Sequence, residues 1–334
     1  MRRFERIAFA AGVLLFAGLV VRLGPERVGR QLLEIGWGFL PVLALSFLPQ
    51  LFNALSWQRL LPEGSRVPLP AMTRMLVAGE AVNAVSPVGV VGGELVRLSQ
   101  LSEVVPAESA AACVAMAALA QFCGQIVFVV TGLPLVLPLL PGRAERAGYL
   151  MFSAVSIALL GLVLSFAASK GWRTRALAAT NRVGWIRRRL AAVPERWRVA
   201  ANDALAAFRA RPGRFAAASA FSLLAWQTGA AETWLILRFL RPALSPARAY
   251  AIEVLAVAIE GVFFFVPAKI GTQEGGKALI FLAAGLDPAK GFTLGLVRRV
   301  RELCWAAVGF GLLGNRARRR APVPAASAVV IPRG

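Results

Sequence analysis

The sequence predicts an all-α polytopic membrane protein, with about six spanning helices and two re-entrant helical hairpins arranged as an inverted repeat. Hydrophobic residues make up 57% of the 334 residues and charged residues 16%, whereas a soluble domain is about half apolar and about a quarter charged. The apolar residues form blocks long enough to cross a bilayer. Two further apolar segments are interrupted by proline, glycine and charge, and both carry the same spacing of acidic residues.

The spanning segments are predicted from their length and composition, because a helix that crosses the hydrocarbon core needs about 20 mostly apolar residues. The first candidate follows a basic start and resembles a signal peptide. The sequence Val20-Val21-Arg22-Leu23 offers no small-residue cleavage site, so we expect a retained signal anchor. The candidates are residues 7–23, 37–57, 107–133, 147–168, 215–240 and 291–313.

Residues 71–100 and 250–286 are also apolar, but each contains an internal proline and several charges. Proline removes a helical hydrogen bond and breaks the helix sterically. Backbone that leaves a helix inside the membrane is tolerated only where protein or a wet cavity shields it from lipid. We therefore interpret each segment as a helix–break–helix hairpin that enters the membrane and returns on the same side.

Basic residues are concentrated in two places. Residues 169–214 hold 12 Lys/Arg, with Glu195 and Asp203 as the only acids, and further arginines lie from Arg316 to Arg320. If the chain starts in the cytoplasm, six crossings and two non-crossing hairpins put both regions on the cytoplasmic side, as the positive-inside rule requires. In this topology both termini are cytoplasmic, the first hairpin opens toward the cytoplasm and the second opens toward the outside.

The net charge of +21 is therefore interpreted as an orientation signal. No aromatic-basic platform accompanies the charge, so we expect no nucleic-acid partner. Clustered arginines beside a membrane attract anionic lipid head groups, and we expect this at the basic loop.

These segments predict one membrane domain over residues 1–315. It consists of a first half (1–168), the cytoplasmic basic loop (169–214) and a second half (215–315). Residues 316–334 end in a stretch rich in proline and alanine, and we expect a disordered cytoplasmic tail there.

The chain contains no histidine, and Cys113, Cys123 and Cys304 lie in apolar stretches without a paired spacing. This composition excludes Ser-His and Cys-His catalysis and histidine metal sites within these residues. We expect no metal and no cofactor, and we find no catalytic constellation that indicates an enzyme.

The two interrupted segments share a spacing of acid, proline, acid and base, and one constant shift along the chain superposes all four positions. Corresponding broken segments in two halves of a sequence indicate a transporter binding site near the bilayer midplane. The positions are Glu80, Pro87, Glu94 and Arg97 in the first segment, and Glu260, Pro267, Glu274 and Lys277 in the second.

An ionisable side chain at membrane depth is by default a candidate functional residue. The glutamates can accept hydrogen bonds or carry protons, whereas the candidate cationic partners are Arg97, Lys277, Arg298 and Arg301. Gly93 and Gly271 allow the backbone to approach a ligand or another helix closely. Arginine beside a broken helix suits a phosphate, and hence a phospholipid head group. The alternative is that the ion pairs only neutralise one another and brace the hairpins.

The last predicted span contains Arg298, Arg299, Arg301 and Glu302 within GFTLGLVRRVRELCW. Three arginines and one glutamate leave a positive surplus inside a membrane helix. Its partners must be glutamates of the hairpins, a water-filled cavity or lipid phosphate. The alternative is that the helix starts later and that these residues lie at the membrane interface. An interfacial position would also account for Glu232 and Glu253, which lie near the ends of predicted helices.

At these residues the chain resembles the flippase-like family related to the transmembrane domain of lysylphosphatidylglycerol synthases. The family's first motif matches Asn83, Pro87, Gly93-Glu94 and Arg97. Its second motif, a proline, a glycine and a glutamate, matches Pro267, Gly271 and Glu274. The stretches FFFVPAKIGTQEGG and LVRRVREL resemble the branch associated with hopanoid-biosynthesis gene clusters. Ala268-Lys269 departs from the pattern, because relatives commonly carry glycine after the proline.

The resemblance implies a multi-pass protein of the bacterial inner (cytoplasmic) membrane that moves a phospholipid or another lipid between leaflets. Synthase relatives carry a separate aminoacyl-transfer domain, and we expect no synthase activity here because only a short tail follows residue 315. Two alternatives stay open, a membrane lipid-modifying enzyme and a non-transporting scaffold for hopanoid or envelope lipid biosynthesis. The oligomeric state is also open. The predicted substrate-binding residues are Glu80, Asn83, Pro87, Gly93, Glu94, Arg97, Glu260, Pro267, Gly271, Glu274, Lys277, Arg298, Arg301 and Glu302.

Overall fold

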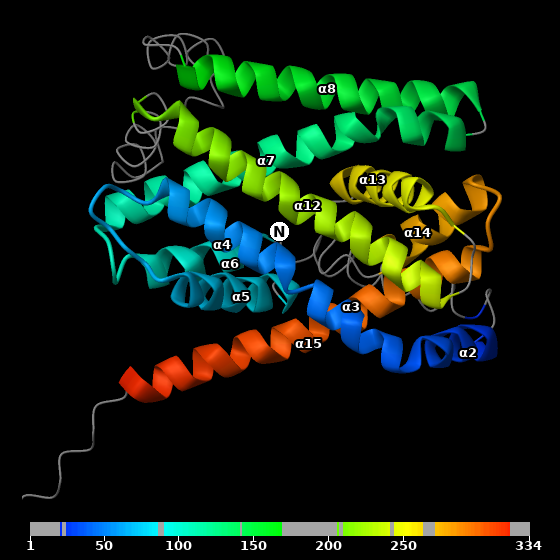
Figure 1. Ribbon diagram of the computed structural model, residues 1–334, viewed down its shortest axis with the longest axis horizontal. Coiled ribbons are helices and arrows are strands. Elements are labelled where there is room, and N and C mark those ends of the chain that lie inside the picture. The colour runs from blue at the N-terminus through cyan, green and yellow to red at the C-terminus, as the bar shows by residue number, and fades with distance from the viewer. Residues whose placement is uncertain are drawn as a thin grey trace, which may run out of the picture.

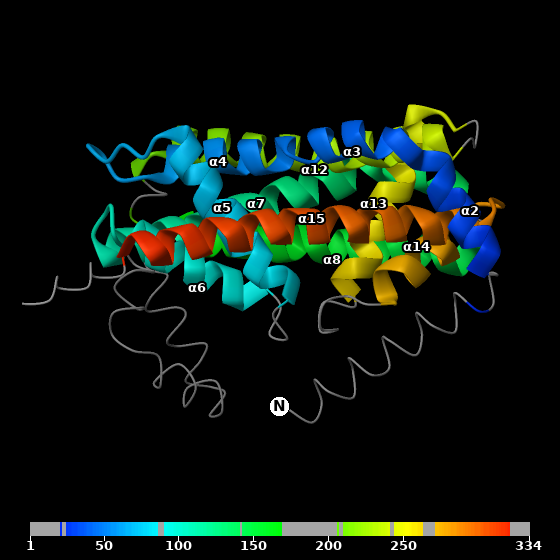
Figure 2. The same cartoon turned by 90° about the horizontal axis from the view of Figure 1, so that it is seen from below.

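The computed structural model is helical throughout its regular structure, as the sequence predicts. The long helices run broadly along the longest axis of the molecule (Figures 1 and 2), and two of the shorter ones, those of residues 90–101 and 272–283, lie below them in Figure 2. The structure describes residues 25–85, 90–140, 142–168, 210–240, 244–262 and 271–320, together with Val21 and Ala206.

From residue 25 onward, the first half of the chain has a series of short helices, one helix pair and two long helices. Its elements are α2 (Pro25–Ile35), η1 (Gly36–Gly38), α3 (Phe39–Leu45), α4 (Leu48–Leu60), α5 (Leu69–Val85), α6 (Val90–Leu101), α7 (Ala107–Val136), η2 (Leu137–Leu139) and α8 (Arg143–Ala168).

The second half contains one long helix, a helix pair and a final long helix. Its elements are α12 (Pro212–Phe239), α13 (Pro246–Val262), α14 (Thr272–Ala283) and α15 (Pro288–Arg320). Proline is the first residue of α12, α13 and α15. This position needs no backbone N–H and suits the fixed φ of proline, so these residues define where the helices start. The final helix continues through Arg320, past residue 315.

Three helical segments are long and apolar enough to cross a membrane within the residues that the structure describes. They are Gly29–Leu60, Ala107–Leu139 and Arg143–Leu162, and they overlap three of the predicted spans. Helices α12 and α15 have 28 and 33 residues, which is enough length for a crossing, but they carry more charge. The predicted anchor 7–23 lies outside the described residues, so the number of spans stays a prediction.

Each interrupted segment contains a pair of helices, α5–α6 in the first and α13–α14 in the second. The two pairs lie in opposite halves of the molecule along its longest axis (Figures 1 and 2). The connections from α4 to α5 and from α6 to α7 lie at one end, and the connection from α14 to α15 lies at the other end. The breaks, with Pro87 and Pro267, lie outside the described residues.

Two buried apolar clusters hold the hairpins in place, one in each half. The first joins α4, α5, α6 and α7 through Trp57, Met72, Leu101 and Cys113. The second joins α12, α13, α14 and α15 through Ile236, Ile252, Phe281 and Leu294. The first of these cores lies within the first half, whereas the second also takes in Ile35 of α2 and Val42 of α3.

The long helices also link the halves, because α15 packs against α5 and α7 packs against α13. Helix α15 approaches both hairpins through glycines. A Cβ atom added at Gly295 would lie 2.8 Å from the Cα of Glu274 on α14, and one at Gly309 would lie 2.5 Å from the Cβ of Ala81 on α5. One helix is thus in close contact with both hairpins.

The outer face of α8 is apolar and exposed. Leu150, Met151, Val155, Ile157 and Leu159 all face away from the protein interior. A soluble monomer rarely exposes such a continuous apolar surface, whereas a bilayer covers it. This helix therefore supports a membrane location.

Candidate functional site

The first hairpin is closed by a charged cluster around Arg97, which lies on α6. Its Nη2 donates a hydrogen bond of 3.0 Å to Oε2 of Glu80 on α5, and its Nη1 pairs with Glu94 one turn earlier on α6. The Arg97 side chain is 10% exposed, whereas Glu80 is 51% exposed and Glu94 is 26% exposed. This cluster joins α5 to α6 and leaves its acids accessible.

A close glycine contact allows α5 and α6 to come together beneath this cluster. A Cβ atom on Gly93 would lie 2.3 Å from the carbonyl oxygen of Gly79. The backbone N–H of Gly93 donates a hydrogen bond of 2.7 Å to Oδ1 of Asn83. Gly93 lies in the first turn of α6, where backbone N–H groups have no partner within the helix. Asn83 therefore caps α6 from α5.

The second hairpin has the same ion pair at the corresponding positions. Nζ of Lys277 on α14 donates a hydrogen bond of 3.2 Å to Oε1 of Glu260 on α13. The shift along the chain that carries Arg97 onto Lys277 also carries Glu80 onto Glu260. The Lys277 side chain is 1% exposed and that of Glu260 is 23% exposed, so this pair lies deeper than its counterpart.

Glu274 departs from the pattern, because it pairs with α15 and not with the cation of its own hairpin. Its Oε1 accepts a hydrogen bond of 3.1 Å from Nε of Arg299, and its Oε2 accepts one of 2.9 Å from the N–H of Gly271. Gly271 has a φ of 76°, in the left-handed region that favours glycine. Glu274 thus fixes the start of α14 and also holds α14 to α15.

The carboxylate of Glu302 extends this contact. It accepts hydrogen bonds from Nε2 of Gln273 at 3.2 Å and from Nη1 of Arg299 at 3.3 Å. It also pairs with Arg301 at 3.5 Å. Glu302 therefore lies between the second hairpin and the arginines of α15.

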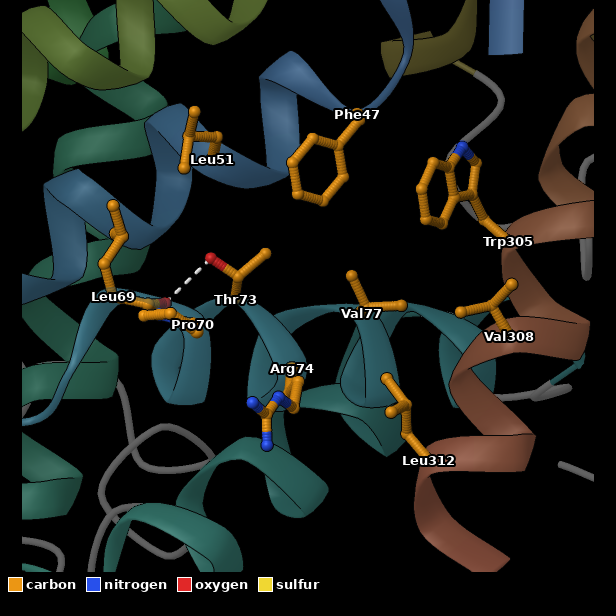
Figure 3. Close-up of a pocket in the computed structure, with 10 residues that line it drawn as sticks. All are labelled: Phe47, Leu51, Leu69, Pro70, Thr73, Arg74, Val77, Trp305, Val308 and Leu312. Carbon is orange, nitrogen blue, oxygen red and sulfur yellow. Dashed lines mark hydrogen bonds between the residues drawn. The ribbon is translucent and has the colours of Figure 1, made fainter. Parts of the chain in front are cut away.

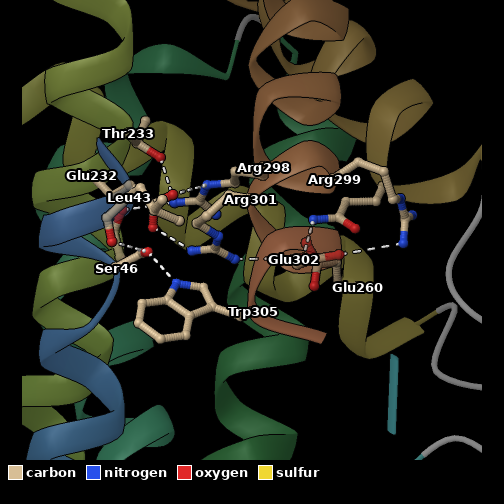
Figure 4. A network of polar contacts seen from close by, with 12 residues as sticks. Leu43, Ser46, Glu232, Thr233, Glu260, Arg298, Arg299, Arg301, Glu302 and Trp305 are labelled. Atoms are coloured by element: carbon tan, nitrogen blue, oxygen red, sulfur yellow. Dashed lines mark hydrogen bonds and ion pairs between the residues drawn. The ribbon is translucent and has the colours of Figure 1, made fainter. Parts of the chain in front are cut away.

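A third group of charges joins α15 to α12 and α13 (Figure 4). Nη1 of Arg298 donates to Oε1 of Glu253 at 2.8 Å, and its Nη2 donates to Thr233 Oγ1 at 2.8 Å and to the carbonyl of Gly229 at 2.7 Å. Arg301 donates to Oε2 of Glu232. Both carboxylates of this group are buried.

Glu232 and Glu253 are both buried within the protein, and each pairs with an arginine of α15. Their depth relative to the membrane interface stays a prediction. The arginines lie more than nine residues inside a helix that starts at Pro288, which excludes the alternative that this helix starts after them. The positive surplus of α15 is matched by acids from α12, α13 and α14.

Some buried atoms of this group have no hydrogen-bond partner within the described chain. They are Nε of Arg298, Nε of Arg301 and Oε1 of Glu232, and Arg298 Nε lies 4.0 Å from Glu232 Oε1. Buried polar groups are rarely left unsatisfied. This group can therefore still bind a water molecule or a ligand oxygen.

The family model of the lysylphosphatidylglycerol synthase TM region matches residues 6–311. The chain belongs to that family. The match covers both hairpins, α12 and all the charged positions described above, so the clusters lie within the membrane region that defines the family. No curated protein and no solved structure matches the chain significantly. The resemblance to a hopanoid-associated branch stays a prediction.

In this member of the lysylphosphatidylglycerol synthase TM-region family, the predicted residues form local groups. The structure brings together Glu80, Asn83, Gly93, Glu94 and Arg97 in the first hairpin, and it joins Glu260 to Lys277 in the second. Each hairpin binds its cation with its own acids. The remaining predicted residues within the described chain, Gly271, Glu274, Arg298, Arg301 and Glu302, lie around α15.

The sequence prediction of the site missed Glu232, Thr233, Glu253, Gln273 and Arg299. Arg299 had a usable signal, because it lies between two predicted site residues in a charged run. Glu232 and Glu253 are two of only 17 acids in the chain, and both occur in apolar segments, which was the signal available for them.

Proposed function

We propose that this protein moves an amphipathic substrate between the leaflets of the inner membrane. The substrate is either a lipid with an anionic head group or a lipid-linked molecule. The proposal depends on one observation. The same ion pair, Arg97–Glu80 and Lys277–Glu260, recurs at matching positions of two broken helical segments that lie in opposite halves of the molecule. Transporters place their sites at such matched breaks.

An inverted repeat is supported by the helix boundaries. The shift that carries Arg97 onto Lys277 moves the starts of α5, α6 and α7 to positions 249, 270 and 287, close to the starts of α13, α14 and α15 at 246, 272 and 288. The packing exchanges in the same way, since α5 packs against α15 and α13 packs against α7. Two halves related in this way can offer one site alternately to each leaflet.

The orientation is proposed from the positive-inside rule. The end of α8, the start of α12 and the end of α15 lie at the end of the molecule where the first hairpin opens (Figure 1). These helix ends flank the basic loop or carry the arginines up to Arg320. We assign this end to the cytoplasm, with both termini inside and the basic loop against anionic lipid head groups.

In the proposed mechanism a lipid phosphate competes with a carboxylate for an arginine. Arg97 is the cation that exchanges partners, because one of its acids, Glu80, is half exposed and the cluster is therefore open to a competing anion. Arg301 and Arg298 form the deeper site, and Glu94 and Glu274 exchange salt bridges or protons as access alternates. Protonation of a glutamate would release its arginine for the phosphate.

Of the three proposed phosphate-binding arginines, Arg298 is the one whose contacts also suit a bracing role. Its guanidinium is buried and donates to Glu253, Thr233 and the carbonyl of Gly229. The first hairpin, with its accessible acids, is therefore the sharper place to test transport.

The test is translocation of fluorescent short-chain phosphatidylglycerol in vesicles that contain the purified protein. We expect wild type to move the lipid and both Arg97→Gln and Glu94→Gln to lose most of this activity. Arg66→Gln is the matched control, because Arg66 is exposed in the α4–α5 connection. Full transport by both hairpin variants would refute the assigned roles. Mass spectrometry of a lipid extract after incubation would reveal chemical conversion, as the enzyme alternative requires. Binding of biosynthetic enzymes without lipid movement would favour the scaffold.

A further inference from the structure

An open groove of about 320 Å³ lies between α4, α5 and α15 (Figure 3). Its walls are mainly aliphatic and aromatic, with Leu51 on α4, Val77 on α5 and Val308 on α15. The hydroxyl of Thr73 donates to the carbonyl of Leu69 at 2.9 Å, so it is satisfied within its own helix. The groove is thus an apolar channel along the surface of the protein.

Arg74 is the charged residue that lines this groove. Its side chain is exposed, and no acidic side chain of the described chain pairs with it. Arg74 lies five residues after the start of α5 at Leu69, about 8 Å along the helix. With the start of α5 at the cytoplasmic surface, as the proposed orientation has it, Arg74 lies close to the head-group region.

The inner end of the groove is closed by aromatic side chains beside the charged group of α15. The rings of Phe47 and Trp305 are stacked with centroids 5.7 Å apart, and Nε1 of Trp305 donates to Oγ of Ser46 at 2.8 Å. Trp305 lies one helical turn after Arg301, which pairs with Glu232. Arg74 and Trp305 thus line the same groove, and Trp305 adjoins the deeper charged group (Figures 3 and 4).

We infer that this groove binds one acyl chain of an anionic phospholipid, with its phosphate at Arg74, and that it is the access site from the cytoplasmic leaflet. The binding depends on charge complementarity between a phosphate and an exposed arginine at the mouth of an apolar channel. Only the role in access rests on the proposed function.

Photo-crosslinking from inside the groove tests the occupant. The protein with Val308→p-benzoylphenylalanine is reconstituted in vesicles of equal phosphatidylglycerol and phosphatidylcholine, and the adducts are identified by mass spectrometry. We expect phosphatidylglycerol adducts to exceed phosphatidylcholine adducts about fivefold, which corresponds to about 1 kcal/mol for one charge. The same crosslinker at Leu159, on the exposed face of α8, should give a ratio near one.

Charge variants assign the preference to Arg74. Arg74→Gln should reduce the ratio at position 308 to that at position 159, Arg74→Lys should retain most of it, and Arg66→Gln should leave it unchanged. An unbiased ratio, a ratio insensitive to Arg74, or crosslinks to residues 7–23 or to a second copy would each overturn the inference. These outcomes are separate from loss of transport in the Arg97 variant, so either proposal can fail alone.

Discussion

The two hairpins carry the same spacing of acids and base, yet their charges lie in different surroundings. In the first, Glu80 is 51% exposed and Glu94 is 26% exposed. In the second, Glu274 and Lys277 are each 1% exposed. The same pattern therefore forms an accessible cluster in one half and a buried one in the other. Such a pattern identifies positions in a repeat, but the helices that cover it decide what each position can do.

The difference has a cause in the packing of each hairpin. Gly79 and Gly93 let α5 and α6 touch, whereas the corresponding residues of the second hairpin are Ile259 and Gln273. Of these, Ile259 lies against Gly276 of α14, whereas Gln273 and Glu274 bind Glu302 and Arg299 of α15. Both hairpins are thus joined by an ion pair, to which the first adds a backbone contact and the second adds ionic contacts with α15.

The largest expected effect is in the buried charges around α15. Glu253→Leu leaves the buried Arg298 with a distant carboxylate, since Glu232 lies 4.0 Å away. Removing one partner of a buried ion pair costs about 3–5 kcal/mol, so the midpoint of thermal unfolding in detergent should fall sharply. Glu80→Leu, at the exposed end of the first cluster, should change it little.

The double variant Glu253→Leu/Arg298→Met is the control for this loss. Replacing both partners with apolar residues removes the stranded charge, and stability should recover by several kcal/mol. Equal losses in the single and double variants would show that the packing of the leucine, and not the unpaired arginine, causes the effect.

Matched glutamates give the second comparison. Glu274→Ala removes hydrogen bonds from Arg299 and Gly271 at a buried position, with an expected loss of about 2–3 kcal/mol. Glu94→Ala, at the corresponding and more exposed position, should cost less than about 1 kcal/mol. Unfolding both variants in parallel measures the difference in their stability. A larger loss for Glu94→Ala would contradict our conclusion that the charges of the second hairpin are the more deeply buried ones.

The smallest of these effects concerns backbone contact. Gly93→Ala would place a methyl group against the carbonyl oxygen of Gly79, and such overpacking typically costs about 1–3 kcal/mol. Gly276→Ala meets only Cγ2 of Ile259 at 3.0 Å, a side-chain atom that can shift. Thermal unfolding should show a larger loss of stability for Gly93→Ala than for Gly276→Ala. An equal loss would mean that α5 and α6 do not cross more closely than α13 and α14.

Local spacing was enough to predict part of the fold and site. The helical class, the positions of the two helix pairs, and the bonds of Arg97 to Glu80 and Glu94 all follow from residues close in sequence. The pairing of Arg301 with Glu232 does not, because the two are 69 residues apart and their meeting depends on how α15 crosses α12. Hairpin glutamates were among the expected partners of the arginines of α15, but which glutamate meets which arginine depends on how α15 crosses α14, where Glu274 pairs with Arg299.

Helix α15 has a consequence for how the halves move. Its glycine contacts at Gly295 and Gly309 are separated by about 21 Å along a rigid helix, and Arg301 lies between them. If the ionic contacts of Arg301 act as a pivot, a tilt that loosens α15 from one hairpin presses it toward the other. Access to the proposed site from the two sides of the membrane would then be mechanically coupled. Opening the site on one side would close it on the other without any separate signal.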